Sequence, residues 1–148
     1  MRTRGFTFIE ILIVMIIIGV IAAFGIPRFH GAIEKNNVRA ARAAVGTTVA
    51  KARAAAIQRG CRAYLHFTSG SDATMWVAVC NLRTPALDTL GGIDSVSARW
   101  NVTVTASRDS VIYLPSGISR DYLPTLVVFT SNAVRDSIII NEVGKVVR

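Results

Sequence analysis

The sequence has few of the residues that catalysis and metal binding use. Among its 148 residues there are two histidines, two cysteines and nine acidic side chains. It contains no phosphate-binding glycine loop, no His/Cys cluster at metal-ligand spacing and no paired carboxylates. His66 stands alone in an expected strand, and Ser116 lacks the flanking pattern of a nucleophile elbow. We therefore expect no catalytic residue, no metal, no cofactor and no small-molecule substrate.

Charge is nearly absent from residues 6–26, where Glu10 is the one ionisable side chain. Twenty-one residues in a helix extend about 31 Å, which matches a hydrocarbon core of roughly 30 Å. A secretory signal would have a shorter apolar run followed by a small-residue cleavage site. Here the small residue is Gly5, before the run, so cleavage there would leave the helix on the mature chain. The segment predicts a membrane helix, with an ordinary signal-anchored periplasmic domain as the alternative.

Residues 4–10, Arg-Gly-Phe-Thr-Phe-Ile-Glu, together with the apolar run and Pro27, resemble type IV pilins and the pseudopilins of type II secretion. The resemblance implies that a prepilin peptidase cuts after Gly5 and methylates the new amino terminus at Phe6. It also implies that Glu10 serves assembly and that Pro27 kinks the helix.

The charge at Glu10 is costly at membrane depth and so needs a role. After cleavage, the amino group of Phe6 would be a cation at the start of a helix. In a filament, Glu10 could pair with the Phe6 amino group of a neighbouring subunit, and the pairing would offset the cost of burial. The alternative is that Glu10 reaches the lipid headgroups from one turn inside the membrane.

The helix is expected to continue to Arg59, because residues 32–59 lack proline, have one glycine and are rich in alanine. Small apolar residues recur at spacings of three and four and should share one face: Val38, Ala41, Val45, Val49, Ala52 and Ala56. A basic stripe flanks this face, formed by Lys35, Arg39, Arg42 and Arg53. It is either a solvated helix edge or a contact for an acidic neighbour. Gly60 is a plausible helix stop.

Short runs of β-branched and aromatic residues follow Gly60 and predict strands at 61–67, 74–80, 100–106, 111–114, 126–130, 138–141 and 145–147. Residues 82–94, with one proline and a Gly-Gly pair, predict a surface loop. The expected fold class is α+β, a long N-terminal helix packed on a small antiparallel β-sheet head. The expected divisions are a leader at 1–5, a transmembrane and assembly helix at 6–27, an amphipathic helix at 28–60 and the head at 61–148.

The two cysteines allow a geometric prediction. A turn centred on Gly70 and Ser71 would pair residues whose numbers sum to 141, which places Cys61 opposite Cys80. Directly opposed residues have Cα separations of about 4.5–5.5 Å, near the disulfide range. We expect a disulfide, with two buried free thiols or a metal site as the alternatives.

Three later segments narrow the resemblance to the GspH/FimT group of minor pilins and pseudopilins. They are residues 52–60, which resemble the group's "ARSEAIKRG" helix end, residues 113–117, and residues 138–148. Two departures matter: Ala54-Ala55 replace the usual Ser-Glu, and Lys145 to Arg148 replace the Gly-Arg-x-Arg pattern of DNA-binding members. Lys145 and Arg148 are therefore only possible contacts for DNA or a partner.

The formal charge of +8 falls to +6 once Arg2 and Arg4 are removed, since 15 basic and 9 acidic side chains remain. Such a charge suits nucleic acid, anionic lipid or an acidic protein. The sequence predicts a minor pilin or pseudopilin held in the bacterial inner membrane by one span, with its head in the periplasm or in an extracellular filament. Its expected partners are prepilin peptidase, other pilin or pseudopilin subunits and inner-membrane lipid. The alternative function is DNA binding for uptake.

Overall fold

The structure is a computed structural model that describes residues 6–147, apart from the side chains of residues 25–28. The chain forms two units, which meet between Glu34 and Lys35. One helix, α1 (Phe8–Arg59), contributes to both of them.

The N-terminal unit is the first half of α1, and its apolar side chains have no protein cover. Every described side chain from Phe6 to Phe24 is exposed. A helix that is apolar all round belongs either in a protein core or in a membrane. By length and hydropathy, α1 contains a segment that is able to cross a membrane, and none of that segment is buried in protein.

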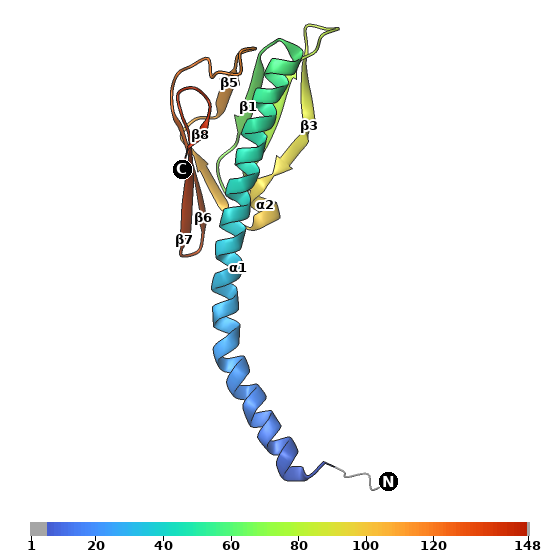
Figure 1. Cartoon of the computed structure of the whole chain (residues 1–148), viewed down its shortest axis with the longest axis vertical. Helices are drawn as coiled ribbons and strands as arrows, with labels where there is room; N and C mark the ends of the chain where they lie inside the picture. The colour runs from blue at the N-terminus through green and yellow to red at the C-terminus, as the bar shows by residue number, and fades with distance from the viewer. Residues whose placement is uncertain (1–5, 148) are drawn as a thin grey trace. The chain divides into compact units, whose positions relative to one another are not determined.

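The second unit is built around the other half of α1. The six small residues expected to share a face are all buried: Val38, Ala41, Val45, Val49, Ala52 and Ala56. The spacing prediction for this face is confirmed. These side chains belong to the same buried cluster as residues of the strands, and Figure 1 shows this part of α1 running alongside β1.

The strands form two antiparallel four-stranded sheets. The first sheet has the order β3 (Leu87–Ser95), β2 (Thr74–Cys80), β1 (Ala63–Phe67), β5 (Ser110–Tyr113). The second has the order β4 (Thr103–Ala106), β6 (Thr125–Ser131), β7 (Val134–Ile140), β8 (Val146–Val147). A short helix, α2 (Val96–Trp100), joins β3 to β4. The α+β prediction is confirmed, with two sheets in place of the expected one.

The core lies where both sheets meet α1. Its largest fully buried side chains are Tyr113, Phe129, Leu65, Met75 and Ile140. They come from β5, β6, β1, β2 and β7, so the two sheets share a single core with the helix.

The β1–β2 register differs by one residue from the predicted one. Leu65 pairs with Val77 and Phe67 pairs with Met75, so that paired numbers sum to 142 instead of 141. All four of these side chains are buried. The predicted register would have placed the outward-facing Trp76 opposite Leu65, and a slip of one residue moves every side chain to the other face of the sheet.

Two predicted elements were wrong. Residues 82–94 are not one loop, because β3 begins at Leu87 and pairs with β2. Trp100 does not begin a strand but ends α2, and the left-handed Asn101 (φ 49°) follows it. In both places the pairing with β2 or the packing of α2 outweighs the local sequence preference.

Candidate functional site

The first turn of α1 is capped by a reciprocal pair of hydrogen bonds. The backbone N–H of Thr7 donates to Glu10 Oε2, and the backbone N–H of Glu10 donates to Thr7 Oγ1, each at 3.4 Å. This is a capping box, in which a threonine before the helix and a glutamate three residues later satisfy two free N–H groups. The Thr7-x-x-Glu10 spacing is the signal of such a box in the sequence, and it was not among the predictions. Glu10 therefore has a partner within its own chain.

The other predicted residues of this segment are only partly described. Phe6 precedes the helix and its side chain is 77% exposed. Gly5 lies outside the described residues. Pro27 lies within α1, and its side chain also falls outside the description. The roles of Gly5, Phe6, Glu10 and Pro27 in processing and assembly thus stay predictions.

The head is fastened to the end of α1 by a disulfide between Cys61 and Cys80. The pair was expected, but its geometry differs from the prediction. Cys61 lies before β1, not opposite Cys80 within the hairpin, and the Cα atoms are 6.3 Å apart. The bond joins the exit of the helix to the last residue of β2.

Arg59, in the last turn of α1, reinforces the same junction. Its guanidinium donates to the carbonyl of Cys80 at 3.0 Å and to Asp88 Oδ2 at 3.2 Å. Because Asp88 lies on β3, one side chain holds the helix end to two strands. The disulfide and this arginine thus both connect the helix end to the first sheet.

Tyr113 ties the C-terminal hairpin to the core. Its hydroxyl donates to the carbonyl of Gly144 at 3.0 Å, and the side chain is fully buried. Burial raises the pKa of Tyr113 to about 12, against an opposing effect of the nearby Arg53 cation. Gly144 has φ +76°, and a Cβ there would collide with the Tyr113 ring. Glycine is therefore required for the turn and for the close approach of the ring.

Gly117, in the Pro-x-Gly element after β5, approaches α1 in the same way. A Cβ at Gly117 would lie 2.7 Å from Ile57 Cδ1 and 3.1 Å from Arg53 Nε, and its φ is +76°. Two of the three segments that resemble the GspH/FimT group, residues 113–117 and 138–148, thus have a structural role, because each carries a glycine that lets a loop pack on the core.

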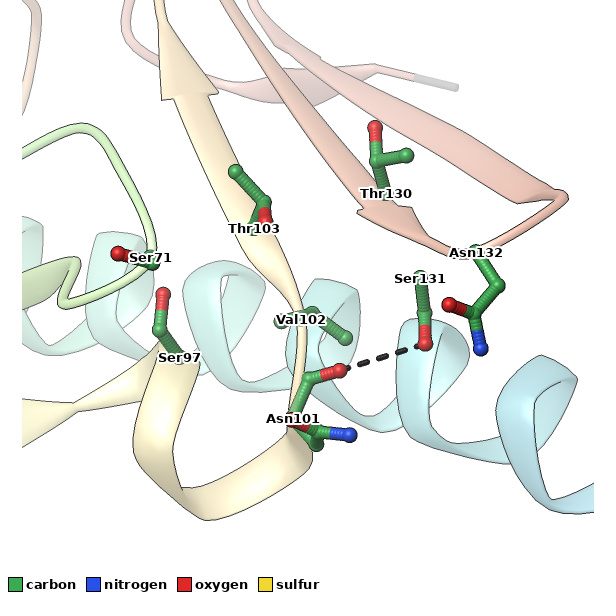
Figure 2. Close-up of a pocket in the computed structure, with 8 residues that line it drawn as sticks. All are labelled: Ser71, Ser97, Asn101, Val102, Thr103, Thr130, Ser131 and Asn132. Carbon is green, nitrogen blue, oxygen red and sulfur yellow. Dashed lines mark hydrogen bonds between the residues drawn. The ribbon is translucent and has the colours of Figure 1, made fainter.

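A polar hollow of about 190 Å³ lies beside the β6–β7 turn (Figure 2). Seven of its eight lining residues carry a hydroxyl or amide group: Ser71, Ser97, Asn101, Thr103, Thr130, Ser131 and Asn132. None of the eight is charged. Ser131 Oγ donates to the Asn101 carbonyl at 3.3 Å, and Ser97 Oγ accepts from the backbone N–H of Ala73 at 3.1 Å. The first bond joins β6 to the residue after α2 and the second joins α2 to the residue before β2, which gives these two hydroxyls a structural role.

Comparison with known protein families gives two matches. Residues 1–26 match the prokaryotic N-terminal methylation motif. Residues 41–144, more than half of the chain, match the family described as type II transport protein GspH. The chain belongs to the GspH family. Among curated protein sequences, none matches it.

Solved structures show that this GspH-family chain has the pilin fold. It is similar to the type IV minor pilin FimU of Pseudomonas aeruginosa in two crystal forms. For the first, the TM-score is 0.62 at 10% identity, over 77% of this chain and 89% of FimU. For the second, the TM-score is 0.58 at 9% identity, over 74% and 90%. At such identities the likeness concerns the fold alone.

Membership of the GspH family identifies a structural pilin subunit, not an enzyme. The family implies contact with other pilin subunits, and the methylation motif implies processing by prepilin peptidase. Among the described residues there is no group of three or more His, Cys, Asp or Glu that could hold a metal ion.

The predicted basic residues of this GspH-family chain differ in their exposure and pairing. Arg42 is paired within the chain to Asp136, with Nη1 and Oδ2 3.0 Å apart. Lys35 and Arg39 are exposed on α1, and Lys145 is exposed in the turn before β8. Arg148 lies outside the described residues. Contact of Lys145 and Arg148 with DNA or a partner stays a prediction.

Proposed function

We propose that this chain is a minor pilin or pseudopilin whose work is assembly. In this proposal, prepilin peptidase cuts after Gly5 and methylates Phe6, and the apolar half of α1 then moves from the bacterial inner membrane into a filament. The head stands in the periplasm or in the extracellular part of that filament. There it caps or initiates a type IV pilus or a type II secretion pseudopilus.

One observation carries the proposal: the described side chains of residues 6–24 are all exposed, although nearly all are apolar. Exposure of this apolar surface to water would cost about 25 cal/mol per Å², so the surface has to be covered. Lipid covers it in the membrane, and neighbouring helices of the same kind would cover it in a filament. Such a surface suits a subunit that exchanges one apolar environment for the other.

In this proposal, Glu10 fixes the axial position of each α1 helix relative to the helix of the neighbouring subunit. Its carboxylate bonds to the Thr7 N–H at 3.4 Å, a long and therefore weak hydrogen bond. The charged amino group of a neighbour's Phe6 would be a stronger partner, because ionised donors and acceptors make shorter and stronger bonds. Exchange of the capping bond for this ion pair would favour one axial position between adjacent helices.

Mass spectrometry and photo-crosslinking test the proposal. Mass spectrometry of the mature protein should give a chain that begins at Phe6 and carries one added methyl group. A photo-crosslinker at Ile16, which is exposed in α1, should join this chain to other subunits bearing the methylation motif. The crosslinks should disappear in cells that lack prepilin peptidase. An intact Met1 terminus, or adducts with lipid alone in cells with a complete assembly machine, would contradict the proposal.

The alternative function is DNA binding by the head, and its support is the exposed Lys145 together with the exposed Arg135 on β7. Neither has an ion pair among the described residues. DNA retention that falls steeply between low and moderate salt, and that weakens in Lys145→Ala, would favour this alternative. Retention that is absent at low salt would exclude it.

A further inference from the structure

The outer face of the first sheet carries three aromatic side chains next to one another. Tyr64 and His66 alternate along β1, and Trp76 of β2 is paired directly with His66. The ring centroids of His66 and Trp76 are 4.9 Å apart, with an angle of 18° between the ring planes. Those of Tyr64 and His66 are 6.2 Å apart, with an angle of 13°. Tyr64, His66 and Trp76 are called the aromatic cluster below.

The aromatic cluster lies on the face of the sheet that does not contact the core. Leu65, Met75 and Val77, which alternate with the three rings along β1 and β2, are almost fully buried and pack in the same core as α1. The side chains of the aromatic cluster are only half-buried. Each ring therefore keeps part of its surface open to a ligand from solvent.

Two exposed arginines flank the aromatic cluster, and neither forms an ion pair within the described residues. The backbone N–H of Arg120 donates to the carbonyl of Ile112 at 2.8 Å, and Ile112 is paired with Tyr64. Opposed residues share a face, so Arg120 lies on the outer face, two strand spacings or about 10 Å from Tyr64. Arg62 lies two residues before Tyr64, and strand alternation places it on the same face.

The outward-facing positions of the described strands in this sheet include no carboxylate. The acidic residues of β3, Asp88 and Asp94, are paired with Val79 and Met75, whose side chains are buried on the α1 side. Each of the two carboxylates already has an arginine as its ion-pair partner. The outer face is therefore aromatic and cationic, with no strand carboxylate to offset its arginines.

We propose that this outer face binds single-stranded nucleic acid, with bases stacked on the aromatic cluster and phosphates held by Arg62 and Arg120. An acidic protein would engage the arginines but does not bring a flat ring at every repeat. A neutral glycan would stack on the rings but has no use for the cations. A single strand brings both, and its bases are free to stack, whereas those of a duplex are paired inside.

Rings on the central strands of a four-stranded antiparallel sheet are a known means of stacking two or three unpaired bases. β1 and β2 are the central strands of the first sheet. The proposed site lies apart from Lys145 and Arg135, which belong to the second sheet and its last turn. It does not depend on filament assembly.

The test measures binding of a fluorescent oligothymidine of about 16 nucleotides to the full-length protein in detergent at low salt. Trp76→Ala should weaken binding about fivefold to 150-fold, because it removes the ring under one base, whereas Trp76→Phe should keep it. A duplex of the same length should bind more weakly than the single strand. Oligouridine should bind like oligothymidine, since the proposal contains no contact to the 2′-hydroxyl.

Arg120→Gln is the variant that leaves the packing intact, because Arg120 is exposed. It should lower the slope of log affinity against log salt by about 0.7, the effect of one lost phosphate contact. Arg135→Gln is the matched control, an exposed arginine of β7 without an ion pair among the described residues, and it should change neither affinity nor slope. In Trp100→Phe, Trp76 is the one remaining tryptophan, and oligothymidine should quench its fluorescence. The free energy of unfolding is measured for each variant, because cross-strand aromatic pairs also stabilise a sheet.

Three results would each overturn the proposal: a duplex bound as tightly as the single strand, unquenched Trp76 fluorescence, or an affinity that folded Trp76→Ala or Arg120→Gln leaves unchanged. Polyglutamate that competes as well as unlabelled oligothymidine at equal charge would also overturn it, because the face would then be a site for an acidic protein. None of these results bears on the proposed function, which the Ile16 crosslinks test separately.

Discussion

Gly144→Ala tests whether the C-terminal hairpin is locked to the core as the structure indicates. Two effects should destabilise this variant. The left-handed φ of +76° costs an L-residue about 1–2 kcal/mol. The new methyl group also meets the Tyr113 ring and lies 3.2 Å from Ser119 Cβ, and such overpacking costs about 1–3 kcal/mol. The expected loss in free energy of unfolding is therefore about 2–5 kcal/mol.

The matched control is Gly60→Ala. Gly60 also has a left-handed φ, +63°, but a Cβ there meets no atom within 4 Å. This variant should lose only the backbone part, about 1–2 kcal/mol. The difference between the two variants isolates the collision with Tyr113 and Ser119.

The assay is equilibrium urea unfolding of the head unit, Lys35–Arg148, followed by tryptophan fluorescence. With a slope of roughly 1–3 kcal/mol per molar urea, the midpoint of Gly144→Ala should fall about 1 M below that of Gly60→Ala. Equal midpoints for the two variants would refute the reasoning, because they would mean that the hairpin moves away from Tyr113 at no cost.

Three further predictions follow from the same contacts. The pKa of Tyr113 is raised from 10.0 to about 12, so the free energy of unfolding of the head should fall between pH 10 and 12, by up to about 2–3 kcal/mol. Tyr113→Phe has no hydroxyl to ionise, so its unfolding measured against pH should not show this fall. Cys61→Ser opens a disulfide across 19 residues and should cost about 3 kcal/mol in non-reducing unfolding, whereas freely alkylated thiols in the native wild type would contradict the bond. Glu10→Val should still insert and be processed but should lose Ile16 crosslinks at equal membrane abundance; undiminished crosslinks would leave Glu10 as a capping residue only.

The sequence was sufficient for the helix and for the class of the fold. The face from Val38 to Ala56 could be predicted because six small residues keep helical spacing without interruption, and local periodicity requires no knowledge of the rest of the chain. The methylation motif could be found for a similar reason, since its residues are adjacent in sequence.

The predictions that were wrong, the β1–β2 register and the loop in place of β3, depend on contacts between residues that are distant in sequence. The turn between β1 and β2 allows two registers, and the choice between them is made by burial of Leu65, Phe67, Met75 and Val77 on one face. Alternation of apolar and polar residues in both strands would have given the observed register, had it been used instead of the turn. β3 was missed because Gly91-Gly92 reads as a loop, and only the backbone of β2 makes it a strand.

In the proposed assembly, the capping bonds of Glu10 would make entry into a filament an exchange of partners and not the creation of a bond by an isolated charge. In the single chain, the Thr7–Glu10 bonds cap the helix start and partly satisfy the carboxylate. The free energy released on joining a neighbour is reduced by what those bonds contribute. The same quantity is recovered when the subunit leaves. A filament held by such exchanges would be easier to dismantle subunit by subunit, and each released subunit would regain the capped helix start that it had before assembly.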